Sequence, residues 1–253
     1  MKRLVVLPLL FILLGLGCKQ GHQAKLLIAT AASAKFPMNK LIDAFTKKKG
    51  VECELIVSSS GKLTAQIIEG APYHLFISAD MKYPNVLFEK KLSNEPTIYG
   101  YGKLVLWTAN KNINPSMDGL TKEEIKHIAV PNPKIAPYGE VAVEVLKYYN
   151  IYDKVEKKLV YGENVSQTNQ FILSGAAELG FTSKSTVLSD EIKGKGNWIE
   201  LPRASYSPIA QGAVMLKSTN KLETTAQAFL DYLSSSEGQA ILEEFGYITS
   251  LDE

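Results

Sequence analysis

The chain has 253 residues, of which 45% are hydrophobic and 21% charged, and its formal net charge is +2 at neutral pH. This length and apolar content are enough for one large or two medium-sized globular domains. Lys2 and Arg3 lie in an N-terminal segment that we expect to be removed, which leaves a mature chain with a net charge of 2 − 2 = 0. Because a nucleic-acid-binding protein needs a basic face, we exclude nucleic acid as a partner.

The first residues are typical of an export signal. Two basic residues precede an apolar run, residues 4–16, that is too short and too close to the N-terminus for an ordinary membrane-spanning helix. The run ends in Leu-Gly-Leu-Gly-Cys, and the segment resembles a lipoprotein signal, in which the cysteine is lipidated and becomes the first residue. We therefore predict a lipoprotein signal peptide at residues 1–17, a lipid on Cys18 and a linker at residues 18–24. A plain secreted protein is the alternative.

From residue 25 onward, buried strands alternate with amphipathic helices. In each repeat an apolar strand ends in a turn of small or hydroxylated residues, and apolar residues three and four apart then indicate a helix. This alternation predicts parallel sheet with helices on both faces, and in such sheets ligands bind at the carboxyl ends of the strands. The expected strands are 25–29, 55–57 and 75–78, and the expected helices are 36–45, 63–68 and 86–92.

The middle of the chain continues the alternation, beginning with one long apolar strand at residues 101–107. A short helix is expected at residues 122–126, and the chain closes with two helices after residue 223. We expect two α/β lobes, because the pattern of strands restarts in the middle of the chain. Lobe one would hold residues 25–102 and 208–253, and lobe two would hold residues 103–207. A chain that leaves lobe one and later returns to it crosses twice between the lobes, and these two crossings form a hinge. A ligand between the lobes is then held when they close.

Four turns look alike, and each joins a predicted strand to a predicted helix. They are Ala32-Ser33-Ala34, Ser59-Ser60-Gly61, Pro137-Tyr138-Gly139 and Asn164-Val165-Ser166, two in each lobe. The first N–H groups of a helix lack partners, and the helix dipole favours negative charge there. Four such starts at one cleft would surround an oxyanion with neutral donors. The ordinary alternative is that each polar side chain only caps its helix.

The second turn carries a resemblance to one protein family. Residues 58–80 read Ser-Ser-Ser-Gly-Lys-Leu, then Gly-Ala-Pro, then Leu-Phe-Ile-Ser-Ala-Asp, and this run resembles the periplasmic molybdate-binding proteins of ABC importers, the ModA family. The resemblance extends over residues 26–247 and includes the other three turns. It implies an α/β fold of the two-lobed periplasmic binding protein type (type II-like), with the ligand in the cleft between the lobes.

The same resemblance implies which residues bind the anion. Ser33 and Ser60 would each offer a hydroxyl and a backbone N–H, and Tyr138 and Val165 would offer backbone N–H groups. In some relatives a tyrosine hydroxyl completes the shell, but Ser183 stands at that position here, so we assign no fifth contact. Molybdate would be bound as a whole oxyanion, without direct metal ligands and without a cofactor.

The function that the resemblance implies is delivery of molybdate, and also tungstate, to a membrane permease and its ATPase. The protein would be a lipid-anchored monomer in the periplasm or on the outer face of the cytoplasmic membrane. The alternative is a receptor for another tetrahedral oxyanion such as sulfate or phosphate. Protonated phosphate needs an acceptor, and the only carboxylates near the four turns are Glu140 and Glu163. This composition favours a fully ionised dianion. We expect Lys62, which follows the second turn, to be solvated.

The motifs of common enzymes are incomplete in this sequence. Gly61-Lys62 resembles the end of a phosphate loop, but Leu63 and Ile56 stand where that loop needs a hydroxyl residue and a glycine. The three histidines lie in no context typical of a serine triad, and their spacing does not suit a metal site. We therefore expect a binding protein and not an enzyme.

Overall fold

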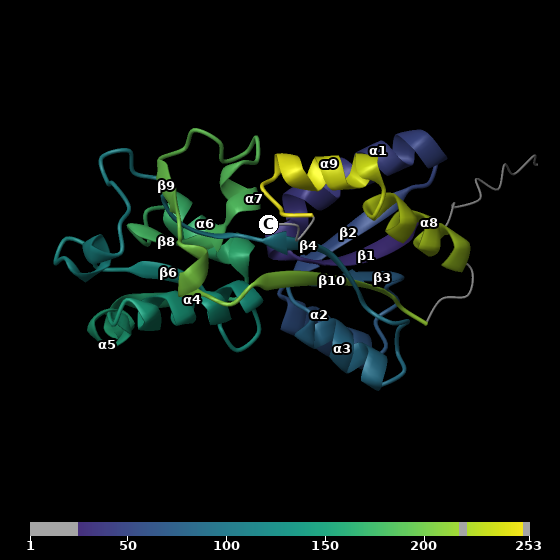
Figure 1. Cartoon of the computed structure of the whole chain (residues 1–253), viewed down its shortest axis with the longest axis horizontal. Coiled ribbons are helices and arrows are strands. Elements are labelled where there is room, and N and C mark those ends of the chain that lie inside the picture. The colour runs from purple at the N-terminus through teal and green to yellow at the C-terminus, as the bar shows by residue number, and fades with distance from the viewer. Residues whose placement is uncertain (1–24, 218–221, 250–253) are drawn as a thin grey trace, which may run out of the picture.

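The computed structural model describes residues 25–217 and 222–249. The predicted signal peptide and Cys18 lie outside the described residues. Within the described ranges, no helix is both long enough and apolar enough to cross a membrane. These ranges form two lobes that lie side by side, each with one sheet and helices on both of its faces (Figure 1). The predicted two-lobed α/β fold is therefore confirmed.

The first lobe is built on a five-stranded sheet. Its strands are β1 (Leu26–Ala31), β2 (Cys53–Ser58), β3 (Leu75–Ile77), β4 (Thr97–Gly102) and β10 (Ile209–Met215). Their order is β2-β1-β3-β10-β4, with β10 antiparallel to both of its neighbours. The expectation of a parallel sheet is thus wrong for β10. This strand enters the lobe at the end where β1, β2 and β3 finish, so it must run in the opposite direction.

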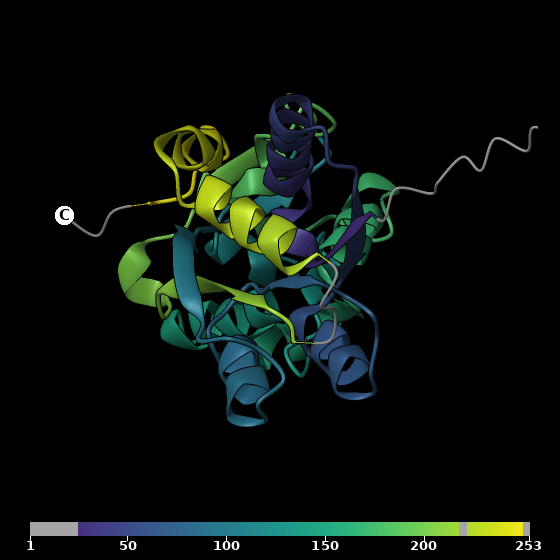
Figure 2. The same cartoon turned by 90° about the vertical axis from the view of Figure 1, so that its right-hand side faces the viewer.

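Helices cover both faces of this first sheet (Figure 2). One face carries α1 (Lys35–Lys49), α8 (Glu223–Leu233) and α9 (Ser236–Glu244), and the other carries α2 (Ser60–Ile68) and α3 (Lys82–Glu89). Phe45 and Phe229 are fully buried between α1 and α8, and their rings meet edge to face at 5.2 Å. The C-terminal helices therefore complete the core of the N-terminal lobe.

The second lobe repeats this architecture. Its strands are β5 (Leu104–Thr108), β6 (Ile128–Pro131), β7 (Leu159–Gly162), β8 (Leu179–Ser183) and β9 (Asn197–Glu200). Their order is β7-β6-β8-β5-β9, in which β5 is antiparallel to both neighbours. The helices are α4 (Pro137–Tyr148), α5 (Tyr152–Val155), α6 (Val165–Leu173) and α7 (Lys184–Val187). Across each sheet, three parallel strands thus lie next to one reversed strand, which is β10 in the first lobe and β5 in the second. In this order β1 and β2 correspond to β6 and β7.

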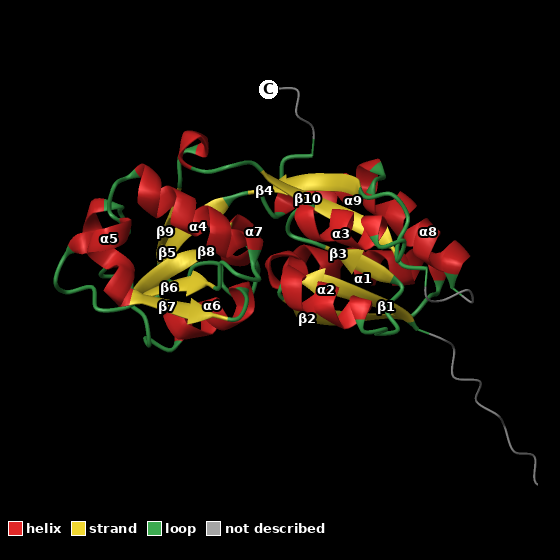
Figure 3. Ribbon diagram, turned by 90° about the horizontal axis from the view of Figure 1, so that it is seen from below, coloured by secondary structure: helices red, strands yellow, loops and turns green. Residues whose placement is uncertain are grey.

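The chain crosses between the sheets at Lys103 and again between β9 and β10 (Figure 3). The single strand predicted at residues 101–107 is therefore two strands, since β4 ends at Gly102 and β5 begins at Leu104 in the other sheet. The apolar pattern is continuous across this point, so local periodicity gives no sign of the break.

The helix predicted at residues 122–126 does not form. A short 3-10 helix lies just before it, at Asp118–Thr121, where the Ser116 hydroxyl accepts a hydrogen bond from Gly119 N at 3.1 Å. The N–H groups of Lys126 and His127 both donate to the carboxylate of Glu178, at 3.0 and 2.7 Å. These two bonds hold the chain extended up to the start of β6 and use donors that a helix would need.

Candidate anion-binding site

The four turns singled out in the sequence meet at one hollow between the lobes. Its lining includes Ser33, Ser60, Tyr138 and Val165, together with Ala79. The turns with Ser33 and Ser60 follow β1 and β2, and those with Tyr138 and Val165 follow β6 and β7, the corresponding strands of the second sheet. The structure therefore brings all four predicted residues together. Their role as ligands of an anion stays a prediction.

The hollow is small. Its cavity volume is about 10 Å³, roughly the space of a single water-sized sphere. Pockets for drug-sized organic ligands measure about 300–1,000 Å³. The space between the four turns is therefore far too small for an organic substrate, and only a small ligand suits it.

Ser33 presents a buried hydroxyl that has no partner. Its side chain is 1% exposed, and within the described part of the chain only Thr30 Oγ1 and Ser33 Oγ are buried side-chain oxygens without a hydrogen bond. An unsatisfied buried hydroxyl costs about 1–3 kcal/mol. Because Ser33 lines the hollow, a bound oxyanion would be the acceptor that its hydroxyl lacks among the described residues.

Ser60 differs from its neighbours in what its hydroxyl contacts. Ser59 is the N-cap of α2, and its hydroxyl accepts from Lys62 N at 3.4 Å. Ser60 Oγ instead accepts from Ala79 N at 3.1 Å and is fully buried. An oxygen that accepts this bond keeps its own proton to donate. The capping role therefore belongs to Ser59, and Ser60 is left to face the hollow as a donor.

Asp80 holds the turn that carries Ala79. Its carboxylate accepts from the Ser78 hydroxyl at 3.0 Å and from Tyr83 N at 3.3 Å. Burial raises the pKa of this carboxyl to about 6. The sequence drew attention to Ser-Ala-Asp only as part of a family resemblance. In the structure these residues direct the backbone N–H of Ala79 at the hydroxyl oxygen of Ser60.

Tyr138 and Val165 stand at the starts of α4 and α6. Ala136 caps α4 without a side-chain hydrogen bond, and Pro137 has no N–H, so Tyr138 carries the first N–H of this helix. A side chain at Gly139 would place its Cβ 2.0 Å from the carbonyl oxygen of Pro131, so only glycine lets α4 begin this close to β6. Val165 is the first residue of α6, which Asn164 caps by accepting from Gln167 N at 3.1 Å.

Ser183, which we did not assign to the site, lies beside the hollow without lining it. Its hydroxyl is 2.9 Å from those of Ser185 and Thr186. Ser185 Oγ donates to the backbone carbonyl of Ser33 at 2.6 Å, across the interface between the lobes. Sequence reasoning missed Ser185. The second lobe uses it to hold the Ser33 turn in place.

Two ion pairs join the lobes at the rim of the hollow. Lys62 Nζ lies 2.7 Å from Glu163 Oε1, and Lys82 Nζ lies 2.8 Å from Glu140 Oε1. The expectation that Lys62 is simply solvated is therefore wrong, although half of its side chain remains exposed. The hydrogen bond that Lys82 donates to the Glu140 carboxylate raises the pKa of Lys82. The carboxylates of Glu140 and Glu163 are thus each balanced by a lysine of the other lobe.

The donors around the hollow suit an oxyanion bound as a whole. Across residues 25–217 and 222–249, no three His, Cys, Asp or Glu side chains come together as a metal site would require. The candidate contacts are hydroxyl and backbone N–H groups at helix starts, which bind anions well. Among the residues that the structure describes, no side chain of positive charge lines the hollow.

Known proteins resemble this chain along most of its length. The family model described as "bacterial extracellular solute-binding protein" matches residues 26–248. The chain is 35% identical over 227 residues to the molybdate-binding protein ModA of Rhodobacter capsulatus, covering 89% of this chain and 88% of that protein. It is 34% identical over 238 residues to ModA of Azotobacter vinelandii, covering 92% and 93% of the two chains. The solved structure of the periplasmic molybdate-binding protein of A. vinelandii superposes with a TM-score of 0.85 at 32% identity, covering 89% of this chain and 100% of that one.

We expect Ser60→Ala and Ser33→Ala each to weaken anion binding about ten- to a hundredfold. A hydrogen bond to a charged group contributes about 1.5–3 kcal/mol, and about 1.4 kcal/mol is tenfold in affinity. Isothermal calorimetry with molybdate is the measurement, and Ser58→Ala is the control because Ser58 does not line the hollow. Wild-type affinity in both Ser33→Ala and Ser60→Ala would show that the anion does not bind at these helix starts.

The rim charges give a second test, in which the two partners of one ion pair behave differently. Lys62→Gln leaves the Glu163 carboxylate unbalanced beside the site and should weaken binding of a dianion. A unit charge about 10 Å from a dianion contributes about 0.8 kcal/mol in water, or about fourfold in affinity. Glu163→Gln should not weaken binding. The difference should shrink in high salt because such charges are screened. Equal losses in the two variants would mean that the pair acts only as a mechanical clamp.

Proposed function

The chain belongs to the family of bacterial extracellular solute-binding proteins, and we propose that it binds molybdate and presents it to an ABC transporter. The observation that carries the proposal is the buried hydroxyl of Ser33, which lacks a partner in the described structure and lines a small hollow with Ser60 and two helix starts. The relatives at 35% and 34% identity are named as molybdate-binding proteins, and they align with this chain over both lobes.

The chemistry of the hollow supports a fully ionised oxyanion. Its polar groups are suited to donating hydrogen bonds, and the nearby carboxylates of Glu140 and Glu163 are each engaged by a lysine. A protonated oxyanion would need an acceptor at the site, and these carboxylates do not line the hollow. Tungstate has nearly the size and charge of molybdate, so we propose that it binds as well. Sulfate and phosphate are the alternatives that a titration must separate.

The proposed role places the protein outside the cytoplasmic membrane. We propose that it is exported, that Cys18 carries a lipid that anchors it to the membrane surface, and that it works as a monomer with a permease and its ATPase. The basis for the anchor is the apolar segment that ends at this cysteine. The proposal requires no cofactor and no catalytic step.

Thermal unfolding in the presence of each anion tests the proposed ligand. A ligand at about one hundred times its Kd stabilises the folded state by about 2.7 kcal/mol. For a chain of this size that corresponds to a rise in Tm of about 5–10 °C. We expect this rise with molybdate and with tungstate, and a much smaller rise with equal concentrations of sulfate and phosphate. A large shift with phosphate and none with molybdate would contradict the proposal.

The lipid anchor has a separate test. We expect intact-mass analysis of protein extracted from its own membrane to give a mature chain that begins at Cys18 and carries acyl groups. Cys18→Ser should release the protein from the membrane without changing its affinity for molybdate. A mature chain that begins after residue 18 and has no acyl mass would refute the anchor and leave the proposed ligand untouched.

A further inference from the structure

Gln211 occupies an unusual place for a polar residue. It lies on β10, the strand by which the chain returns to the first lobe, and its side chain is fully buried. We propose that Gln211 is a positioning residue of the anion site, which acts through a buried hydrogen bond to the hydroxyl of Tyr138. The inference rests on the proposed function, because Tyr138 is one of the residues proposed to bind the anion.

Three tyrosine hydroxyls surround the Gln211 amide. Its oxygen accepts from the Tyr99 hydroxyl at 2.5 Å and from the Tyr247 hydroxyl at 3.3 Å, and its Nε2 donates to the Tyr138 hydroxyl at 3.1 Å. None of these four side chains is more than 6% exposed. A hydroxyl both donates and accepts, so either orientation of the amide pairs with all three tyrosines. Because an unpaired buried polar group is costly, the amide and the Tyr138 hydroxyl stay bonded to each other.

The hydrogen bond between Gln211 and Tyr138 joins the two lobes at the hinge. Tyr138 belongs to α4 of the second lobe and Gln211 to the sheet of the first. A Cβ added to Gly102 would lie 2.2 Å from the Tyr138 hydroxyl oxygen and 2.3 Å from Gln211 Nε2. Gly102 is the last residue of β4, next to the point where the chain crosses between the lobes. A bond this close to the pivot moves little when the lobes open, so it can hold the start of α4 throughout.

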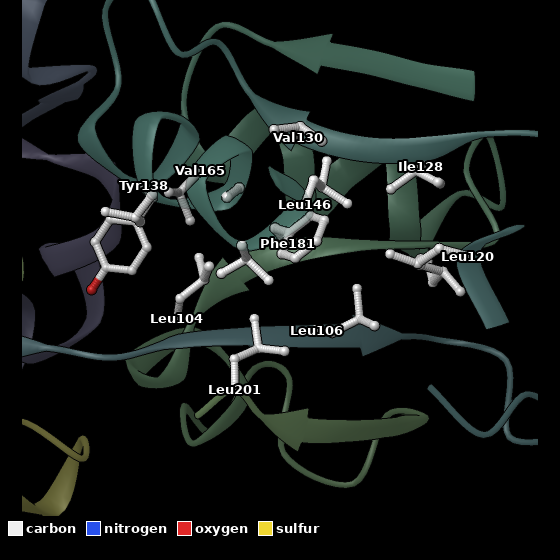
Figure 4. Packing of buried hydrophobic residues seen from close by; sticks show 14 of the residues in the cluster. Leu104, Leu106, Leu120, Ile128, Val130, Tyr138, Leu146, Val165, Phe181 and Leu201 are labelled. Carbon is white, nitrogen blue, oxygen red and sulfur yellow. The ribbon is translucent and has the colours of Figure 1, made fainter. Parts of the chain in front are cut away.

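Tyr138 connects this hinge contact to the hollow. Its backbone lies at the hollow, while its ring fills the edge of the core of the second lobe and its hydroxyl points away from that core (Figure 4). Holding the hydroxyl therefore fixes the first turn of α4, and with it the N–H proposed to face the anion. The Tyr99 hydroxyl also lies 3.4 Å from the Ser78 carbonyl, in the turn that directs Ala79 N at Ser60. Gln211 is thus tied to turns of both lobes that line the site.

The test compares molybdate affinity with stability in the full-length protein. Gln211→Met keeps the size of the side chain and removes all three hydrogen bonds of the amide. We expect it to weaken molybdate binding about three- to tenfold, the effect of one hydrogen bond. The control is Thr108→Val, which removes another buried hydrogen bond, from Thr108 Oγ1 to the Glu178 carbonyl at 2.6 Å, in the second lobe and outside the hollow. That variant should lose stability and keep its affinity.

A double variant separates positioning from general loss of stability. If Gln211 acts through Tyr138, then Tyr138→Phe alone should weaken binding by a similar factor, and adding Gln211→Met should weaken it no further. Tyr138→Phe also carries the test by itself if Gln211→Met does not fold. Wild-type affinity in these variants, or losses that multiply in the double variant, would overturn the inference while molybdate binding by the wild type stands. A wild-type protein that binds no molybdate would overturn the proposed function and this inference together.

Discussion

Under the proposed function, the central physical constraint on this protein is the burial of a small ion of double charge without a counter-charge beside it. A charged group taken out of water is tolerated only if hydrogen bonds replace its hydration. The hollow meets this constraint with hydroxyl and N–H dipoles, and the rest of the structure serves to aim them. Ser60 is turned into a donor by Ala79 N, and Ser33 keeps a buried hydroxyl without a partner among the described residues.

The repeated topology of the two lobes makes this arrangement possible. Each sheet ends two neighbouring parallel strands at the cleft, and each of these strands leads into a turn and then a helix. Either lobe alone therefore provides two of the four turns, and only their contact brings all four together. The contacts that join the lobes lie at the same turns, including the hydrogen bond from Gly61 N to the Ile135 carbonyl at 2.9 Å. Under the proposed function, closure of the lobes and assembly of the site are therefore the same event.

Much of this could be predicted from sequence, because the decisive signals are local. Strand, turn and helix follow one another within about ten residues around Ser33 and Ser60, and the run at residues 58–80 identified the family, which the comparisons confirm. The direction of β10 and the break at Lys103 could not be predicted, since both depend on which lobe the chain enters and not on periodicity. Gln211 likewise looks like an ordinary strand residue. Its importance depends on three tyrosines that lie far from it along the chain.

The composition of the lining has a consequence for release of the ion. Among the described residues, Tyr138 is the only titratable residue of the lining, and burial raises its pKa well above the ordinary value. The lining itself therefore holds no group that mild acidification protonates, and the nearby group that can respond is the Asp80 carboxyl behind Ala79, whose pKa burial raises to about 6. Under the proposed function, release of the ion therefore depends on pulling the two lobes apart, which is mechanical work performed on the hinge, and not on a change of charge in the lining.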